Sequence, residues 1–309
     1  MSRGARQGKG FVVSCYKPLQ GFRTPDGVVF SELGRYDILG PIELPCGHCI
    51  GCRMRRASDW ELRVMHEATL QEANCFVTLT YGRDQCPPDF SLQHRDFQLF
   101  FKRLRKHFAP TKVRFFMCGE YGEKHQRPHY HACLFGVDFR SDRVQAGKSG
   151  SGMVFYDSPL LSKLWTHGIV SVQDLVPETA SYCARYIMKK VLGPDSDFAY
   201  EYVDVDGTIV CRRKEYSAMS LRPGIGRRWF DKYYRDVYPL DSVVSRGVER
   251  RPPKYYDGLL KRRKPELLEQ VDFERSKRRA AAFADNTDER RAVREVVHLA
   301  KVSNLKRGL

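Results

Sequence analysis

The periodicity of hydrophobic residues changes repeatedly along the chain, and each change marks a predicted element. Apolar residues that recur every three or four positions are typical of helices, whereas alternating or continuous apolar runs rich in β-branched and aromatic residues are typical of strands. The pattern predicts helices over residues 58–72, 91–108, 160–165 and 177–192. It predicts strands over residues 75–81, 112–119, 128–136 and 168–175, with loops over 120–127 and 146–152.

The order of these elements predicts the fold class. β-α-β-β followed by β-α is typical of a ferredoxin-like or RRM-like α+β fold, in which helices flank a central antiparallel sheet. We place the helices on one face and expect strands 112–119 and 128–136 to form a hairpin. The first helix is expected to begin at a capping box of Ser58 and Glu61.

Composition divides the chain into three regions. Residues 1–60 contain a cysteine-rich segment, residues 61–236 contain the predicted sheet, and residues 237–309 are dense in charge and poor in large apolar residues. We expect the last region to form two or three basic helices after a proline-containing linker. A solvated helical tail is the favoured interpretation, and a segment that clamps DNA or contacts a host protein is the alternative.

The net charge indicates the class of partner. The chain has 53 Lys and Arg against 37 Asp and Glu, a formal charge of +16. The basic runs are spread along the chain rather than confined to one amphipathic helix, which favours nucleic acid over an anionic membrane. No apolar segment approaches the ~18 to 20 residues of a membrane span, and the basic N-terminus lacks a signal-peptide core. We therefore expect a cytosolic protein with no membrane partner.

Several basic side chains are candidates for contact with DNA. The run "PGIGRRWF" places Gly224 and Gly226 before a helix start, where Arg227 and Arg228 would meet a phosphate. A turn with a solvated basic edge is an equal alternative. The candidates are Arg53, Arg55, Arg56, Arg103, Lys106, Arg127, Arg227 and Arg228.

The ten cysteines indicate metal binding rather than disulfides, because the chain has no export signal. The run "PCGHCIGCR" spaces Cys46, Cys49 and Cys52 as in a metal knuckle. We choose Cys15 as the fourth ligand, with His48 as the substitute, and favour a structural Zn²⁺ over an iron–sulfur cluster. Six further cysteines are expected to be small core residues: Cys75, Cys86, Cys118, Cys133, Cys183 and Cys211.

Two histidines lie two residues apart in the run "RPHYHACLFG". Alternate side chains of a strand point to opposite faces, so His129 and His131 share a face with Cys133. A single histidine there is more often a solvent-exposed polar residue. A pair on one face can hold a metal ion that a third group completes.

The helix predicted over residues 177–192 carries a second pattern, "SYCARYIMKK". Tyr182 and Tyr186 lie four residues apart and therefore on one helix face, with Lys189 along the same stripe and Lys190 beside it. Two tyrosines at helical spacing are more often core packing than chemistry. The neighbouring lysines weaken that interpretation.

The combination of "CFVTLTYGRD", "PHYHACLFG" and "YCARYIMKK", in this order, resembles the three motifs of HUH rolling-circle replication initiators. More narrowly, "CYKPLQGFRT", "PCGHCIGCR" and "MSLRPGIGRRWF" resemble the replication initiators of gokushovirus-type microviruses, which are single-stranded DNA phages. The resemblance covers residues 11–235 and implies that residues 61–236 form an HUH endonuclease domain.

The resemblance implies a catalytic Mg²⁺ or Mn²⁺ ion held by His129, His131 and a third polar group, which polarises the scissile phosphate. For the third ligand we choose Glu120, in the loop before the histidine strand, with Glu123 and His125 as alternatives. The strand over residues 75–81 is expected to be structural.

The resemblance also implies a covalent mechanism. Tyr182 or Tyr186 would attack single-stranded DNA at the replication origin, leaving a 3′-hydroxyl and a 5′-phosphotyrosine, with help from Lys189 or Lys190. The second tyrosine would cut the regenerated origin. No "GxxxxGK[ST]" motif is present, so a host helicase and a host DNA polymerase are expected partners in the cytoplasm of the infected bacterium.

Two other classes of function stay open from the sequence. One is a metal-dependent hydrolytic nuclease that forms no covalent intermediate. The other is a zinc-containing DNA-binding protein without enzyme activity, whose tyrosines stack on bases.

Overall fold

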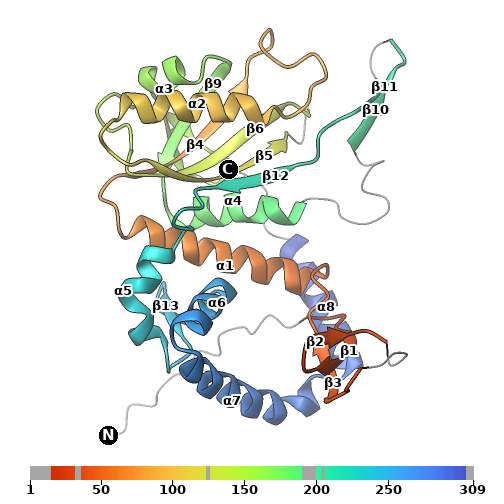
Figure 1. Cartoon of the computed structure of the whole chain (residues 1–309). Helices are drawn as coiled ribbons and strands as arrows, with labels where there is room; N and C mark the ends of the chain where they lie inside the picture. Colours follow the sequence, from red (N-terminus) through yellow and green to blue (C-terminus); the bar gives the residue numbers. More distant parts are fainter. Residues whose placement is uncertain (1–14, 32–35, 123–125, 190–199, 204–205, 304–309) are drawn as a thin grey trace, which may run out of the picture.

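The computed structural model describes residues 15–31, 36–122, 126–189, 200–203 and 206–303, without the side chains of residues 186–189 and 203. At its centre is a seven-stranded sheet in which neighbouring strands are antiparallel (Figure 1). In spatial order its strands are β12 (Tyr216–Met219), β5 (Arg114–Tyr121), β6 (Pro128–Phe135), β4 (Asn74–Tyr81), β9 (Gly168–Asp174), β8 (Val154–Asp157) and β7 (Val144–Lys148). The expected α+β class with a large antiparallel sheet is confirmed.

The four strands predicted from the sequence form the middle of this sheet. Along the chain they follow the order β4, β5, β6, β9, and in space they lie in the order β5-β6-β4-β9, which is the order of a ferredoxin-like sheet. The expected hairpin of β5 and β6 is present. β6 also pairs with β4, so the two histidines lie in an interior strand of the sheet.

Helices cover both faces of the sheet, not one as we expected (Figure 1). Helices α2 (His94–His107) and α3 (Pro159–Leu164) pack on one face, and α1 (Ile50–Ala68) and α4 (Pro177–Lys189) pack on the other. The inner strands require this arrangement because they are apolar on both sides. In β4, for example, Val77 belongs to the first layer and Phe76 to the second.

Helix α1 begins eight residues earlier than the capping box predicted. Its N-cap is Cys49, whose sulfur accepts a hydrogen bond from the amide of Cys52. Ser58 and Glu61 lie inside the helix, and both bind the guanidinium of Arg250 instead. The cysteine segment and the helix are therefore continuous, and α1 spans the boundary that we drew at residue 60.

The glycine- and serine-rich segment near residues 146–152 is not only a loop. Residues up to Lys148 form β7, which pairs with β8, and the register shifts between Gln145 and Gly147. The shift is a β-bulge, a feature at which glycine is common in a strand.

The region after residue 236 is helical, as predicted, but much of it is not a solvated tail. Helices α5 (Arg227–Val237), α6 (Lys254–Arg263) and α7 (Pro265–Ala281) pack with α1 around a second apolar core. Its buried members are Leu62, Phe230, Tyr234, Val237, Tyr238, Val243, Tyr256, Leu259, Leu260 and Val271. The composition underestimated this core because a few aromatic and leucine residues complete a surface that α1 and α5 already provide.

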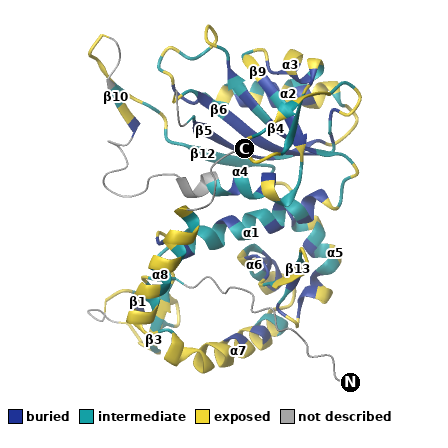
Figure 2. Cartoon of the chain, turned by 180° about the vertical axis from the view of Figure 1, so that it is seen from behind, coloured by how far each residue is buried: buried dark blue, intermediate teal, exposed yellow. Residues whose placement is uncertain are grey.

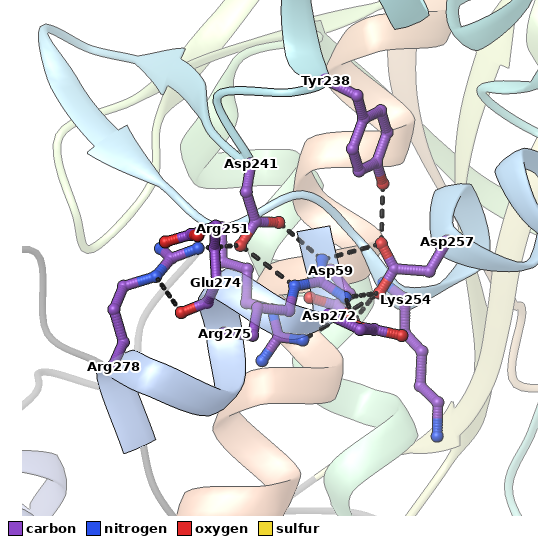
Figure 3. Close-up of polar contacts among 10 residues, drawn as sticks. All are labelled: Asp59, Tyr238, Asp241, Arg251, Lys254, Asp257, Asp272, Glu274, Arg275 and Arg278. Carbon is purple, nitrogen blue, oxygen red and sulfur yellow. Dashed lines mark hydrogen bonds and ion pairs between the residues drawn. The ribbon is translucent and has the colours of Figure 1, made fainter. Parts of the chain in front are cut away.

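A network of charged side chains fastens α7 in place (Figure 3). Arg275, which is 8% exposed, makes two hydrogen bonds to each of two carboxylates, Asp241 and Asp257. Tyr238 donates to the same Asp257 at 2.7 Å. Charge-assisted pairs of this bidentate kind are strongly directional, so the network sets how α7 lies against α6 and the turn before β13 (Val243–Ser245).

The last helix, α8 (Asp288–Ser303), returns to the N-terminal segment, which contains a small sheet of β1 (Leu19–Thr24), β2 (Gly27–Val29) and β3 (Gly40–Leu44). Arg291 pairs with Glu43 at 2.6 Å, and Tyr16 Oη lies 3.0 Å from His298 Nδ1. Most of α8 is nevertheless exposed, as Figure 2 shows.

Short elements complete the described chain. These are the hairpin of β10 (Glu201–Val203) and β11 (Ile209–Cys211), the partner β14 (Val248–Arg250) of β13, and a 3₁₀ turn at Phe283–Asp285. Across the parts of the chain that the structure describes, the helices are too short or too polar to cross a bilayer.

Candidate functional site

The two histidines meet a carboxylate on the sheet face that α4 covers. The β5–β6 register pairs Glu120 with His129, and His131 is the next residue on that face. Glu120 Oε1 lies 2.8 Å from His129 Nε2 and 2.9 Å from His131 Nε2. These three residues can offer one ligand atom each within 4.8 Å of one another, which is a possible metal-binding group.

Glu120 belongs to strand β5 and not to the loop in which we expected it. The hairpin register therefore holds it opposite the histidines more rigidly than a loop would. The two alternatives for the third ligand, Glu123 and His125, lie outside the described residues.

Glu120 is ionised at neutral pH although it is only 1% exposed. Burial raises the pKa of its carboxyl, but the contacts with His129 and His131 outweigh burial and bring the pKa below its ordinary value. A buried carboxylate of this kind keeps a full negative charge at the face where α4 crosses the sheet.

The orientation of both imidazoles is set by their second nitrogen. His129 Nδ1 lies 3.0 Å from the carbonyl oxygen of Arg127, and His131 Nδ1 lies 2.9 Å from Thr78 Oγ1. A carbonyl only accepts, so His129 donates from Nδ1, and a neutral ring then directs the lone pair of Nε2 at Glu120. Two lone pairs at 2.8 Å repel each other unless a proton or a metal ion lies between them. The donor set therefore fits a bound cation.

Thr78 is a site residue that sequence reasoning missed, because we assigned the strand over residues 75–81 a purely structural role. β4 pairs with β6 so that Thr78 is directly opposite His131. The signal was available in "CFVTLTY", where Thr78 and Thr80 are polar residues at alternate positions of an otherwise apolar strand.

Tyr182 reaches this group from α4. Its hydroxyl lies 3.5 Å from Glu120 Oε1, and its ring meets that of His131 edge-on, with centroids 4.9 Å apart. The neighbouring Cys183 is fully buried against the sheet and so fixes the rotation of the helix. The backbone of α4 includes Tyr186 and Lys189, but their side chains, and all of Lys190, lie outside the described residues.

The four predicted knuckle cysteines come together at the start of α1. One sulfur each from Cys15, Cys46, Cys49 and Cys52 lies within 4.8 Å of the others, which is a possible zinc site; His48 is not in this group. Burial raises the pKa of the Cys49 thiol, but N–H groups that donate to its sulfur, among them the amide of Tyr16, bring it down to about 7. Four convergent sulfurs with N–H donors suit tetrahedral Zn²⁺.

The other six cysteines follow the prediction in part. Cys75, Cys118, Cys133 and Cys183 are buried in the sheet and its helices. Cys86 is half-buried and Cys211 is exposed on β11, so the expectation that these two are core residues was wrong.

Few of the predicted DNA contacts lie near Tyr182. Arg103 and Lys106 are on α2, which covers the opposite face of the sheet, and Arg103 donates to the carbonyl of Leu164 at 2.8 Å. Arg127 precedes β6 and donates to the carbonyl of Tyr81 at 3.4 Å.

The start of α5 is occupied by the protein itself. The amide of Gly226 donates to the buried carboxylate of Glu67 at 2.8 Å, and Arg227 pairs with Asp231 at 2.8 Å. The backbone there does not offer Gly226 to a phosphate, which leaves the side chains of Arg227 and Arg228. Arg53, Arg55 and Arg56 lie on α1 directly after Cys52, and all these DNA contacts stay predictions.

The fold and the site define a basic α+β protein in which a carboxylate and two histidines on an antiparallel sheet meet a helix that carries a tyrosine. Residues 74–191 match a family model for replication-associated proteins of the ORF2 type. The chain belongs to the family of replication-associated proteins of microviruses.

Three relatives carry this assignment. The chain is 31% identical to replication-associated protein VP4 of Bdellovibrio phage phiMH2K, over 84% of this chain and 80% of the relative. It is 29% identical to replication-associated protein ORF2 of Spiroplasma virus 4, over 81% of each. It is 30% identical to replication-associated protein ORF4 of Chlamydia phage 1, over 71% of this chain and 54% of the relative. No solved structure matches the chain.

Proposed function

We propose that this protein is an HUH-type endonuclease that nicks and joins single-stranded DNA and initiates rolling-circle replication through a covalent 5′-phosphotyrosine. One observation carries the proposal: the Tyr182 hydroxyl lies 3.5 Å from the carboxylate oxygen that contacts both histidines. A nucleophile and a possible cation site therefore share one position, as phosphoryl transfer requires.

The residues that would hold the divalent cation are Glu120, His129 and His131. Carboxylate oxygen suits Mg²⁺ and Mn²⁺, and imidazole suits transition metals, so the mixed donor set fits Mn²⁺ well and also accepts Mg²⁺. When bound, the cation supplies Lewis-acid stabilisation of the negative charge on the scissile phosphate.

The nucleophile is the phenol oxygen of Tyr182 or Tyr186. That oxygen forms a bond to phosphorus while the bond from phosphorus to the 3′ oxygen breaks. The phenol proton is lost to solvent and the 3′ oxygen takes up a proton, which leaves a 5′-phosphotyrosine and a 3′-hydroxyl. The ester bond is exchanged and not hydrolysed, so a later 3′-hydroxyl can reverse the step and rejoin the strand.

The placement of Tyr182 favours this function over its two rivals. A hydrolytic nuclease would need the same cation site but no tyrosine beside it. A DNA-binding protein without enzyme activity would not need a buried, ionised carboxylate between two histidines. Boiling a reaction with labelled oligonucleotide in detergent separates the classes, because only the covalent mechanism leaves labelled protein.

We further propose that the substrate is the single-stranded phage origin and that host helicase and DNA polymerase complete replication in the cytoplasm of the infected cell. The chain has no "GxxxxGK[ST]" motif, so strand separation has to come from another protein. The division into residues 1–60, 61–236 and 237–309 is part of this proposal.

The histidines provide the direct test. His129→Ala and His131→Ala are each expected to abolish Mn²⁺-dependent nicking of single-stranded DNA and to leave DNA binding largely intact, because binding depends on distributed basic residues. Nicking is measured on denaturing gels and binding by fluorescence anisotropy in EDTA. The control is His107→Ala, at the exposed end of α2. Normal nicking by either site variant would contradict the metal assignment.

Thr78 provides a second test. Thr78→Val keeps the side-chain shape but removes the hydroxyl that holds His131 Nδ1, and we expect a loss of about 10- to 100-fold in Mn²⁺ affinity. Isothermal titration calorimetry measures the affinity directly. Thr78→Ser should retain it, as should Thr80→Val, which lies on the same strand opposite His129. Equal affinities for Thr78→Val and wild type would mean that the hydroxyl does not orient the ring.

A further inference from the structure

A polar cavity of about 570 Å³ lies beside the helix that carries Tyr182. Four separate parts of the chain line it: α1, α4, the turn between β7 and β8, and the hairpin of β13 and β14. Its volume falls in the range of small-ligand sites, about 300–1,000 Å³. The cavity is not part of the Glu120 group, although α4 contributes to both.

The charges that line the cavity are largely arranged in pairs. Arg250 pairs with Glu61 at 3.0 Å, and Arg246 pairs with Glu178 at 3.0 Å. Arg185 is different, because no carboxylate pairs with it among the residues that the structure describes. Its guanidinium lies 6.0 Å from the centroid of the Tyr182 ring. The cavity therefore has a net positive charge, centred on Arg185.

Arg246 occupies a turn position that rarely holds an arginine. Its φ is 54°, and that of Gly247 is 70°. Two successive residues with positive φ form the type I′ hairpin turn, which favours Asn-Gly because bulky side chains strain the left-handed conformation. Despite this strain, the turn directs the Arg246 side chain toward α4, where it binds Glu178 at the cavity wall.

α4 joins the cavity to the proposed reaction site. Ser181 and Arg185 line the cavity, and Tyr182 lies between them in the sequence with its hydroxyl at Glu120. Residues three apart on a helix are neighbours on its surface, so Arg185 lies between the cavity and the tyrosine. A DNA strand whose scissile phosphate is at Tyr182 would pass Arg185 within one nucleotide.

We infer that this cavity binds a nucleotide of the single-stranded DNA next to the scissile phosphodiester, with its phosphate on Arg185. The inference rests on the proposed function and deepens it. Arginine matches a phosphate through two parallel N–H donors, and the serine hydroxyls and paired glutamates offer polar groups to a base. A mixed lining of this kind suits a nucleotide better than an inorganic anion, which the glutamates would repel.

The experiment measures binding of a fluorescein-labelled single-stranded oligonucleotide in EDTA, so that neither metal nor nicking contributes. Arg185→Gln is expected to weaken binding about 5- to 10-fold and to lower the slope of log K against log salt by about 0.7, the value for one phosphate contact on a single strand. Arg185→Lys should restore the slope. The control is Arg140→Gln, whose side chain is 68% exposed after β6.

Thermal unfolding of each variant shows whether it is folded, and Arg185→Glu serves as the stronger probe. Wild-type affinity and an unchanged salt slope in both Arg185→Gln and Arg185→Glu would overturn the inference. The proposed function is tested separately by the covalent adduct of the wild-type protein. An adduct with unaltered binding by the Arg185 variants rejects the cavity alone, and a missing adduct with altered binding rejects the covalent mechanism alone.

Discussion

The double variant Tyr182→Phe, Tyr186→Phe is expected to fold and to bind single-stranded DNA but to form no covalent adduct. Phenylalanine keeps the ring, so the edge-on contact between residue 182 and His131 survives, while the nucleophilic oxygen is lost. Labelled oligonucleotide, Mn²⁺ and a denaturing gel measure the adduct. We expect its yield to fall from a clear band to background.

The single variants separate the two tyrosines. If one tyrosine starts the reaction and the other resolves it, one single change blocks the first nick, and the other permits the nick but impairs rejoining. Tyr233→Phe on α5, where the ring packs beside Trp229, is the matched control and should leave adduct formation unchanged. A protein-linked label in the double variant would place the nucleophile elsewhere and reduce the tyrosine spacing to core packing.

Zinc removal is the second large effect that we expect. Purified protein should contain about one Zn²⁺ per chain, and Cys49→Ser should lose it, because Cys49 is both a member of the cysteine group and the N-cap of α1. We expect a cost of more than about 3 kcal/mol in the free energy of unfolding, a range reached when a structural metal is lost. Elemental analysis and thermal unfolding measure the two quantities.

The exposed cysteine on β11 provides the control for zinc. Cys211→Ser removes a thiol without touching the group and should change neither zinc content nor stability. If well-folded, reduced wild-type protein contained no zinc, the four cysteines would be no more than a packed cluster. α8 contacts the same segment through Tyr16, so loss of zinc should also loosen the contact between Tyr16 and His298.

Much of the site was predictable because it depends on local periodicity. The two-residue period of a strand placed His129 and His131 on one face, and the structure has them there with Cys133 in the layer beneath α4. The spacing of Cys46, Cys49 and Cys52 predicted a metal knuckle, and the four sulfurs do converge. The strands around the site were predicted to within a few residues for the same reason.

What local patterns did not contain were contacts between distant segments. Glu120 was the right choice in the wrong element, because the hairpin register decides where β5 ends. Thr78 acquired its contact with His131 from the pairing of β4 with β6, which are separated by about fifty residues. Neither pairing leaves a signature within a window of a dozen residues.

The same distinction holds for the whole fold. Helices α6 and α7 were predicted from their residues, but their burial depends on the apolar surface that α1 and α5 present, nearly two hundred residues away in the case of α1. The helix layer on the second face of the sheet arises in the same way, since α1 and α4 meet only after the sheet has formed between them in sequence. Periodicity of a single segment determines its secondary structure and the face it can bury, whereas its partner is chosen by the complementary surfaces that the complete chain brings together.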